Sequence, residues 1–477
     1  MNPQLLDTDY LVIGSGAIGM AFADVILNES DASIVMVDRH AAPGGHWNDA
    51  YPFVRLHQAS ARYGVNSRQL GNGKKDAVGL NQGLDELASG HEILSYFDQA
   101  MHVQFLPSGR AQYYPTCNCT VNSQFASLVS GNHYQVTVRK KIVDTTLTKL
   151  VVPSTEAPQF SLAPGVRCAP LNDLPTLARP LGGYVVVGAG KTGVDACLWL
   201  LGNGVAAEAI RWIMPRDAWF TNRANMQSGD DCIESTLLDL ANQVEAMAQA
   251  DSAADLFARL SDCGHWLRLD DRIEPTLFRC ATVTRAELDQ LRRIKNIVRL
   301  GRVCRIEPNQ IILEHGTVSA NPDSLYVHCS AVAFKNPRPH PVFSGNTINV
   351  QWLRTCQPVF SGAMIAHIEV AFQGDAEKNA FCQPVPFPEV PIDWLKMWAV
   401  NLANSHQWGQ NENLRSWLRK SRLDGLSGEI ARIGPTEMAK IAQLKRYRAA
   451  RSQAVANVQH LLGQVDDQSL ATRLTYA

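Results

Sequence analysis

The chain lacks a strong charge of either sign, because its 477 residues include 44 Lys and Arg against 45 Asp and Glu, for a formal net charge of −1. Nucleic-acid-binding proteins usually carry a basic patch, and no basic block stands out here beyond residues 139–141. No stretch approaches the roughly 18 consecutive apolar residues that a membrane-spanning helix needs. The N-terminus has no charged segment followed by an apolar one. We therefore expect a cytoplasmic protein that binds neither nucleic acid nor membrane.

The sequence also lacks the paired cysteines of redox and zinc sites. Its eleven cysteines are scattered, and the closest two, Cys117 and Cys119, are separated by one residue rather than two. Such an unpatterned set is typical of proteins from a reducing compartment. His265, His315 and His367 show no mutual metal-ligand spacing, so we expect no metal site.

Two glycine-rich turns are the most informative features that are present. The first, Gly14-Ser15-Gly16-Ala17-Ile18-Gly19, lies between a β-branched run at residues 10–13 and a helical pattern at residues 20–27. Its first glycine permits a tight turn, its second lets amides approach a pyrophosphate, and its third lets the helix pack on the strand. A second apolar run ends at Asp38, 19 positions after Gly19, where a βαβ unit places the carboxylate that binds a ribose. These features predict a dinucleotide-binding unit.

The second turn, Gly188-Ala189-Gly190-Lys191-Thr192-Gly193, has the same context, with a strand pattern at residues 184–187 and a helical pattern at residues 194–201. The next strand pattern, residues 210–214, is followed by Arg216 where a carboxylate would otherwise stand. A guanidinium can pair with a 2′-phosphate through two charge-assisted hydrogen bonds, which favours NADPH over NADH. The alternative is that Arg216 is an ordinary solvated arginine. Together the two turns predict an electron carrier and its reductant.

A more specific motif follows Asp38. Pro43-Gly44-Gly45-His46-Trp47 and Tyr51-Pro52-Phe53-Val54-Arg55 resemble the GG-x-W and Y-P-x-x-R stretch of flavin-containing and Baeyer–Villiger monooxygenases, in which this loop lies along FAD. The second turn, continued by Val194-Asp195, is similar to the G-x-S-G-x-D form that binds NADPH in that family. No Cys-x-x-Cys follows the first turn, which disfavours the pyridine-nucleotide disulfide reductases.

The resemblance covers most of residues 9–70 and 182–220, and it implies FAD and NADPH as cofactors. The expected FAD contacts are Gly14, Gly16, Ala17, Gly19, Asp38, Arg39, Gly45, His46, Trp47, Arg55, His57, Gln58 and Val143. The expected NADPH contacts are Gly188, Gly190, Lys191, Thr192, Gly193 and Arg216.

His57 and Arg55 are the expected catalytic residues. His57 falls where Baeyer–Villiger enzymes carry an aspartate near the flavin, and a histidine there could be protonated beside a flavin anion. Arg55 is the second candidate for stabilising a flavin peroxide. Two alternatives stay open: His57 hydrogen-bonds a loop carbonyl, and Trp47 is an aromatic residue of the core.

Three stretches depart from the family pattern. Residues 163–170 lack the phenylalanine, glycine and histidine of the Baeyer–Villiger fingerprint, which argues against lactone or ester formation from ketones. The A-T-G strand ends are altered at residues 152–155 and 328–331, and the tail from about residue 385 matches no segment of the family.

The motifs predict an α/β fold with two Rossmann-like dinucleotide-binding domains, in which an FAD domain is split by an inserted NADPH domain, and a helical C-terminal addition. We expect the first part of the FAD domain at residues 1–165, the NADPH domain with a helical insertion at 181–295, the return to the FAD domain at 296–384 and the helical region at 385–477. Residues 134–138 and 141–144 are predicted to form two strands of a β-meander.

The predicted function is that of an FAD-dependent oxidoreductase. NADPH would reduce the flavin, and O₂ would then supply one oxygen atom to a small organic substrate through a peroxyflavin. A reductase or dehydrogenase without oxygen insertion would use the same sites. The alternative from another class is a nucleotide-sensing binding protein, which would not turn NADPH over.

Overall fold

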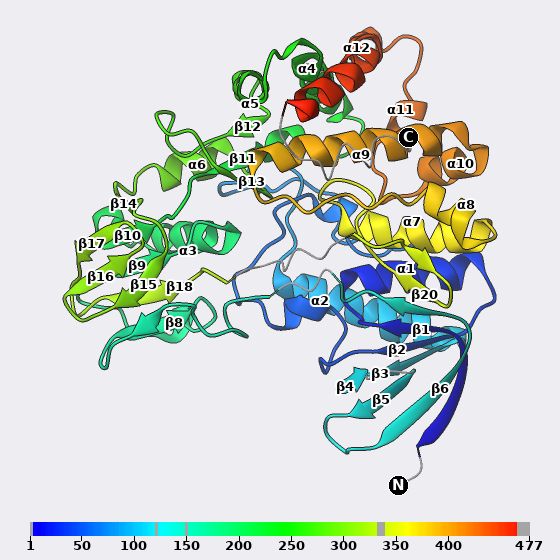
Figure 1. Cartoon of the computed structure of the whole chain (residues 1–477), viewed down its shortest axis with the longest axis horizontal. Helices are drawn as coiled ribbons and strands as arrows, with labels where there is room; N and C mark the ends of the chain where they lie inside the picture. Colours follow the sequence, from blue (N-terminus) through cyan, green and yellow to red (C-terminus); the bar gives the residue numbers. More distant parts are fainter. Residues whose placement is uncertain (1–2, 120–122, 148–150, 332–338, 465–477) are drawn as a thin grey trace.

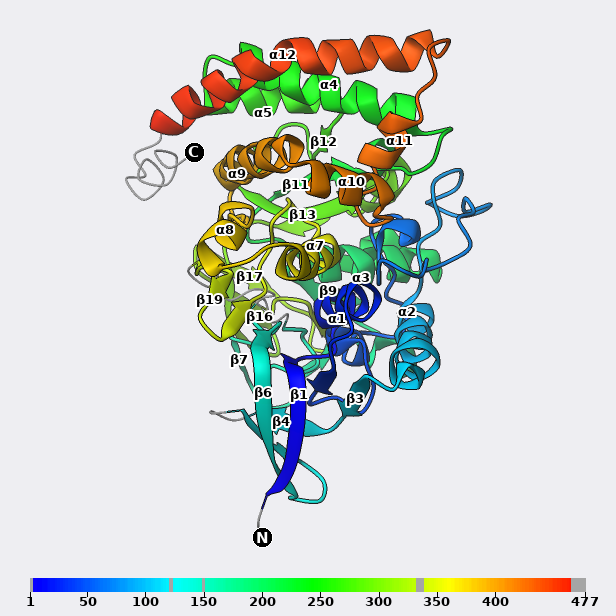
Figure 2. The same cartoon turned by 90° about the vertical axis from the view of Figure 1, so that its right-hand side faces the viewer.

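The computed structural model of the chain describes residues 3–119, 123–147, 151–331 and 339–464. Two α/β units lie side by side beneath a layer of helices (Figures 1 and 2). The first unit is built around β1 (Gln4–Ile13) and α1 (Ala17–Glu29), and the second around β9 (Tyr184–Val187) and α3 (Lys191–Gly202). This arrangement confirms the predicted fold class, with two Rossmann-like units and a helical C-terminal region. None of the helices among the described residues combines the length and the apolar character that crossing a membrane requires.

The first sheet has the order β19-β20-β6-β1-β2-β3, with β4 and β5 beside β6. The pairs of β1 with β2 and β6, of β2 with β3 and of β20 with β6 are parallel. Alternate residues of β1 face opposite sides, so Val12 packs with the helices α1 and α7 while Leu11 packs with Phe125 of β5. The further elements are β2 (Ile34–Val37), α2 (Gly90–Gln99), β3 (Ala111–Tyr114), β4 (Cys117–Cys119), β5 (Gln124–Ser127), β6 (His133–Asp144), β19 (Phe343–Ser344), β20 (Thr347–Asn349) and α7 (Pro358–Ala371).

The prediction of two separate strands at residues 134–138 and 141–144 is wrong, because β6 runs without a break through both. The charged residues 139 and 140, which separate the two predicted strands, are part of β6. Arg139 is accommodated there because it forms ion pairs with Asp7 and Asp9 of the neighbouring strand β1. A register shift in β1 absorbs the irregularity. The antiparallel meander consists of β4, β5 and β6.

The second sheet has the order β14-β10-β9-β18-β8, and all of its pairs are parallel. Its strands are β8 (Arg167–Pro170), β9, β10 (Ile210–Ile213), β14 (Asn296–Val298) and β18 (Leu325–His328). One face packs on α3, and the other packs on a small sheet of the order β17-β16-β15-β7. That small sheet consists of β7 (Ser161–Leu162), β15 (Val303–Ile306), β16 (Gln310–Leu313) and β17 (Gly316–Ser319).

The predicted domain boundaries at residues 165 and 296 differ from the structure. Residues 296–328, expected in the returning FAD domain, lie in the second unit, because β14 pairs with β10 and β18 pairs with β9. β7 and β8, which precede residue 181, belong there too. Apolar runs predict that strands exist but not which strands they join, and full burial of β18 requires a neighbour on both edges. The chain re-enters the first sheet at β19 and β20.

The helical insertion and the C-terminal tail meet in one layer. α12 lies along α4 (Figure 2), where Arg446 pairs with Glu245 at 2.6 Å and the Asn457 amide donates to the Met247 carbonyl at 2.8 Å. A small sheet of the order β12-β11-β13 lies beneath this layer. The elements are β11 (Ala218–Asn222), α4 (Ile233–Gln249), α5 (Ala253–Asp262), β12 (Trp266–Leu267), β13 (Leu277–Val283), α6 (Arg285–Leu291), α8 (Asp375–Ala380), α9 (Pro391–Gln410), α10 (Glu412–Lys420), α11 (Ser427–Ala431) and α12 (Met438–Gly463).

A disulfide joins the two units. Cys280 of β13 is bonded to Cys356, which lies between β20 and α7, across a sequence separation of 76. The unpatterned set of cysteines therefore contains one bonded pair, which the spacing of the cysteines in the sequence does not indicate. A disulfide requires two Cα atoms that lie close together in the fold, and here they are 6.1 Å apart. It does not require a particular spacing of the cysteines along the chain.

Candidate functional site

The first glycine turn leaves the amino end of α1 open. Gly14 has a φ of 100°, a backbone conformation that favours glycine. A Cβ atom on Gly19 would lie 2.0 Å from the Gly14 carbonyl oxygen, so only glycine lets the helix start this close to the strand. No side chain caps the helix at Gly16, and α1 begins at Ala17. The first amides of α1 are therefore available to an anion such as a pyrophosphate.

Asp38 turns back onto this turn. Its carboxylate accepts hydrogen bonds from the Ser15 amide at 2.6 Å and from the Ser15 hydroxyl at 3.0 Å, and His40 donates its own amide at 2.8 Å. Burial raises the pKa of Asp38, but the hydrogen bonds from His40 and Ser15 outweigh burial and hold that pKa below its ordinary value. The charged carboxylate thus lies beside the turn, where a ribose acceptor is needed. The neighbouring Arg39 is exposed.

The loop after Asp38 lies directly on the turn. Gly44 donates its amide to the Ser15 carbonyl at 2.9 Å, and a Cβ on Gly45 would be 2.9 Å from the Gly16 Cα. Burial lowers the pKa of His46 to about 4, so its imidazole is neutral at pH 7. Trp47 is buried in the first core and donates to the Tyr63 hydroxyl at 2.8 Å. Its position fits the alternative of a core aromatic residue.

The second turn repeats the geometry of the first. Gly188 has a φ of 119°, and a Cβ on Gly193 would lie 2.1 Å from the Gly188 carbonyl oxygen. The N-cap residue Gly190 provides no side-chain cap, so the amides at the start of α3 are open as well. Lys191 and Thr192 form the first turn of this helix and are partly exposed.

The Tyr-Pro-Phe segment of the first unit packs on α3 of the second. Lys191 forms an ion pair with Asp195, and the Tyr51 hydroxyl donates to the same carboxylate. Phe53 stacks on Trp199 with ring centroids 4.7 Å apart and planes inclined by 19°. The motif that resembles a flavin-binding loop therefore also holds the two glycine turns in one relative orientation.

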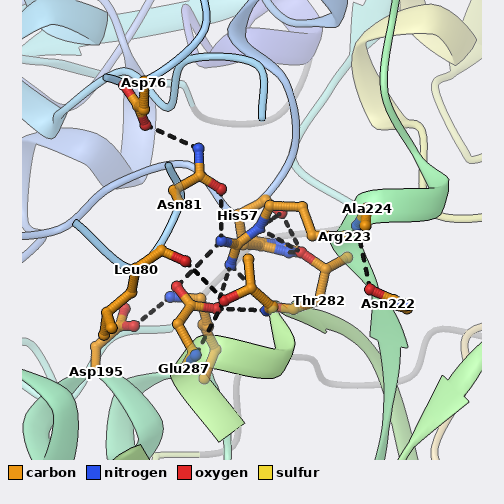
Figure 3. Close-up of polar contacts among 12 residues, drawn as sticks. His57, Asp76, Leu80, Asn81, Asp195, Asn222, Arg223, Ala224, Thr282 and Glu287 are labelled. Carbon is orange, nitrogen blue, oxygen red and sulfur yellow. Dashed lines mark hydrogen bonds and ion pairs between the residues drawn. The ribbon is translucent and has the colours of Figure 1, made fainter. Parts of the chain in front are cut away.

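His57 lies at the junction of the two units, which we define as residues 51–85 against residues 191–199, 223–232 and 282–287. Its carbonyl oxygen accepts hydrogen bonds from Arg223 Nε at 3.0 Å and from the Thr282 hydroxyl. Figure 3 shows the Arg223 guanidinium between His57, Asn81 and Glu287. It donates to Asn81 Oδ1 at 3.0 Å and pairs with Glu287 Oε2 at 2.9 Å.

The imidazole of His57 is neutral. Burial lowers its pKa to about 3, and the nearby cations Lys191 and Arg223 act in the same direction. The expectation of a protonated histidine is therefore not what this environment favours. The alternative was that the His57 side chain hydrogen-bonds a loop carbonyl. In the structure it is instead the backbone carbonyl of His57 that accepts a hydrogen bond, from Arg223.

The remaining predicted FAD contacts are spread over three places. Arg55 is exposed, donates to the Leu87 carbonyl at 3.4 Å, and lines a surface groove of about 520 Å³ with His91 and Tyr96. Gln58 borders a narrow cavity at the start of α7. Val143 is fully buried within the first sheet. The structure thus joins His57 to the second unit but places Arg55 on an exposed groove.

Arg216 and Arg279 share one carboxylate. Arg216 Nη2 and Arg279 Nη2 each lie 3.3 Å from Glu389 Oε1. The acid that follows Arg216, Asp217, is held by Arg299 at 2.7 and 2.9 Å. Its charge is therefore compensated and does not oppose an anion beside Arg216.

Sequence reasoning did not find Arg223, Asn81, Arg279 or Glu389. Only Glu287 carried a signal, since Thr284-Arg285-Ala286-Glu287 has the pattern of a capping box, which the structure contains. The other residues are distant in sequence and become neighbours only through the packing of the units. Within the described ranges, no group of three or more His, Cys, Asp and Glu side chains could hold a metal ion.

No family model matches the chain. Curated relatives include three uncharacterized proteins, one from Mycobacterium bovis and two from Mycobacterium tuberculosis, each 48% identical over 424 residues, which are 89% of this chain and 79% of the relative. The chain belongs to the same family as these proteins.

Solved structures that resemble the chain include three monooxygenases. A polycyclic ketone monooxygenase from Thermothelomyces thermophila has a TM-score of 0.48 at 12% identity and covers 96% of this chain and 89% of its own. A steroid monooxygenase bound to NADP has a TM-score of 0.46 at 11% identity, with 94% and 99% covered. A flavin-containing monooxygenase from Stenotrophomonas maltophilia has a TM-score of 0.41 at 13% identity, with 79% and 100% covered. The fold assignment itself follows from the parallel strand pairs of the two large sheets and from the glycine turns between strand and helix.

Proposed function

We propose that the chain is an oxidoreductase that binds FAD at the first glycine turn and NADPH at the second, and that it acts as a monooxygenase on a small organic substrate. The observation that supports this most is the pair of helices, α1 and α3, whose amino ends are open and are held in one orientation by residues 51–57. Two such helix ends suit two pyrophosphates. The proposal also draws on the motifs that resemble those of flavin monooxygenases.

At the first turn the residues present fit FAD. Gly14, Gly16 and Gly19 leave room for a pyrophosphate, and Asp38 offers its carboxylate to a ribose. When bound, the flavin would accept a hydride equivalent and deliver electrons to O₂. The loop of Gly44 and Gly45 lies over the turn and would cover the dinucleotide from one side.

At the second turn the residues fit NADPH. Gly188 and Gly193 keep the strand and helix close, and Arg216 follows β10 with a guanidinium that suits a 2′-phosphate. Lys191 would stay paired with Asp195, so it would orient the start of α3 rather than carry free charge. The neutral imidazole of His57, half-buried between the two units, would help to exclude water without adding a charge.

The test is anaerobic mixing of the purified protein with NADPH, followed by a pulse of oxygenated buffer while absorbance is recorded. Bleaching of a flavin band, then delayed reoxidation and oxygen uptake coupled to product, is the expected result. Bleaching with immediate reoxidation would indicate a reductase or dehydrogenase instead. A colourless protein that does not consume NADPH would leave only the nucleotide-binding alternative.

The cytoplasmic location expected from the sequence is also a proposal. The Cys280–Cys356 disulfide would be unusual there, because the cytoplasm keeps thiols reduced, so an oxidising compartment is the competing outcome. Cell fractionation followed by immunodetection tests it, and recovery in a membrane or secreted fraction would contradict it.

A further inference from the structure

Glu389 lies between two arginines of the second unit. Its Oε1 atom is 3.3 Å from Nη2 of Arg216, which follows β10, and 3.3 Å from Nη2 of Arg279 on β13. One carboxylate oxygen thus serves two guanidinium groups. Glu389 itself comes from the segment before α9, in the part of the chain that matches no segment of the monooxygenase pattern.

The backbone of Glu389 is fixed while its side chain is accessible. Its carbonyl accepts a hydrogen bond from the Phe278 amide at 3.1 Å, and its amide donates to Asp393 Oδ2 at 2.9 Å. The side chain is 50% exposed. A carboxylate in this position can move away from the arginines without unfolding the segment that holds it.

The charges around Glu389 are unbalanced. Burial lowers the pKa of Arg279, and the charges of Arg216 and Arg302 act in the same direction, while Glu389 opposes them. Two guanidinium groups pair with the Glu389 carboxylate, and the charge of Arg302 also acts on Arg279, so the arginines outnumber the carboxylate that pairs with them. A phosphate dianion would compensate this excess better than one carboxylate does, because it brings more charge and more acceptor atoms.

We propose that Glu389 is a specificity-determining residue that occupies the 2′-phosphate position and is displaced by NADPH. The proposal rests on the proposed function, since it assumes a pyridine nucleotide at the second turn. NADH has no 2′-phosphate and would leave Glu389 on its arginines. The carboxylate thus weakens binding of any 2′-phosphorylated nucleotide by competing for Arg216 and Arg279.

The test compares the binding of two probes, adenosine 2′,5′-bisphosphate and adenosine 5′-monophosphate, by isothermal titration calorimetry on the full chain. E389Q should bind the bisphosphate about fivefold more tightly than the unaltered protein, because a competing charge is removed. Binding of the monophosphate should not change. Glu412→Gln is the matched control, since it removes one negative charge from an exposed position on α10 and should alter neither affinity.

A second variant separates competition from a structural effect. Arg279→Gln should weaken bisphosphate binding, and adding E389Q to it should then give a smaller gain than in the unaltered background. Equal or weaker bisphosphate binding by E389Q would overturn the proposal, as would an equal change for both probes. If neither the protein nor E389Q binds either probe while the flavin band is present, the NADPH assignment fails as well. A missing flavin band with normal bisphosphate results would contradict the proposed function alone.

Discussion

Arg223 holds a positive charge inside the protein, with only 2% of its side chain exposed. Glu287 neutralises it through two hydrogen bonds of 3.0 and 2.9 Å, and the carbonyls of His57 and Thr282 accept further N–H groups. A charge this deeply buried is stable only while its partner is present, because an unpaired ion in the interior is strongly unfavourable. The Arg223 guanidinium is therefore one of the groups on which the junction between the units depends.

Replacing Arg223 should destabilise the protein. Arg223→Gln leaves Glu287 unpaired, so we expect the free energy of unfolding to fall by about 3–5 kcal/mol in urea titration. The control is Arg272→Gln, whose side chain is 88% exposed beside Asp270 and which should cost less than about 1 kcal/mol. Equal losses in the two variants would contradict the role of Arg223. Adding Glu287→Gln to Arg223→Gln should restore part of the stability.

His57 should make stability depend on acidic pH. Its pKa is about 3 in the folded protein because of burial, whereas an unfolded histidine titrates near 6.5. Between these values the unfolded state binds a proton that the folded state does not, so stability falls as pH drops from about 6.5 toward 3. His57→Gln should flatten this part of a plot of melting temperature against pH.

His40 provides a control of opposite sign. Hydrogen bonds to Asp38 and Asp49 raise its pKa to about 9 although burial lowers it. Its stabilising contribution is complete below about pH 6.5 and is lost as pH rises through 9. His40→Gln should therefore change the alkaline side of the same plot. A His57 variant that changed only the alkaline side would contradict the assignment.

Arg216 should distinguish the two pyridine nucleotides. Arg216→Ala removes the guanidinium expected at the 2′-phosphate, so NADPH should lose about 1–3 kcal/mol of binding free energy while NADH changes little. Titration calorimetry with both nucleotides measures this. Equal losses would reject the assignment of Arg216 to the 2′-phosphate.

At the scale of elements, the close approach of β9 and α3 depends on Gly193. A Cβ there would meet the Gly188 carbonyl oxygen at 2.1 Å, whereas a Cβ on Gly202 of the same helix meets nothing within 4 Å. Gly193→Ala should lower stability by about 1–3 kcal/mol and abolish nucleotide binding at the second turn. Gly202→Ala should be neutral or stabilising by up to about 1 kcal/mol. Thermal unfolding with and without NADPH compares the two, and similar behaviour would show that the approach is not needed.

The same elements show what could be predicted from sequence. Both strand–turn–helix units could be predicted from local patterns. In each turn a side chain on the third glycine would collide with the carbonyl of the first glycine, and all of these residues lie within about six positions. The strands with which β14 and β18 pair could not be predicted, because two parallel neighbours in a sheet are separated by a long connection in the sequence. The contacts of Arg223 with Asn81 and Glu287 depend on how whole units pack. They therefore could not be predicted from the spacing of these residues in the sequence.

At the scale of the whole molecule, the Cys280–Cys356 disulfide links the units on β13, two residues from Thr282, whose hydroxyl donates to the His57 carbonyl. Closing a loop across 76 positions restricts the unfolded chain, which corresponds to about 4 kcal/mol in the chain-entropy model. Part of this gain is offset by the left-handed backbone of both cysteines, each with a φ of 56°. The double variant Cys280→Ser with Cys356→Ser should melt at a lower temperature. Cys304→Ser, at an exposed free cysteine, should not, and loss of stability in both would argue against the disulfide.

The pairing of α12 with α4 has a consequence for how the protein is made. Val244 and Met247 of α4 lie in one apolar cluster with Val458 and Leu461 of α12. During synthesis α4 (Ile233–Gln249) is produced well before α12 (Met438–Gly463). The apolar face of α4 that contacts α12 is therefore exposed while the residues between the two helices are translated. The helical layer therefore reaches its final packing only after residue 463 has been synthesised, and until then the apolar face of α4 is open to other contacts.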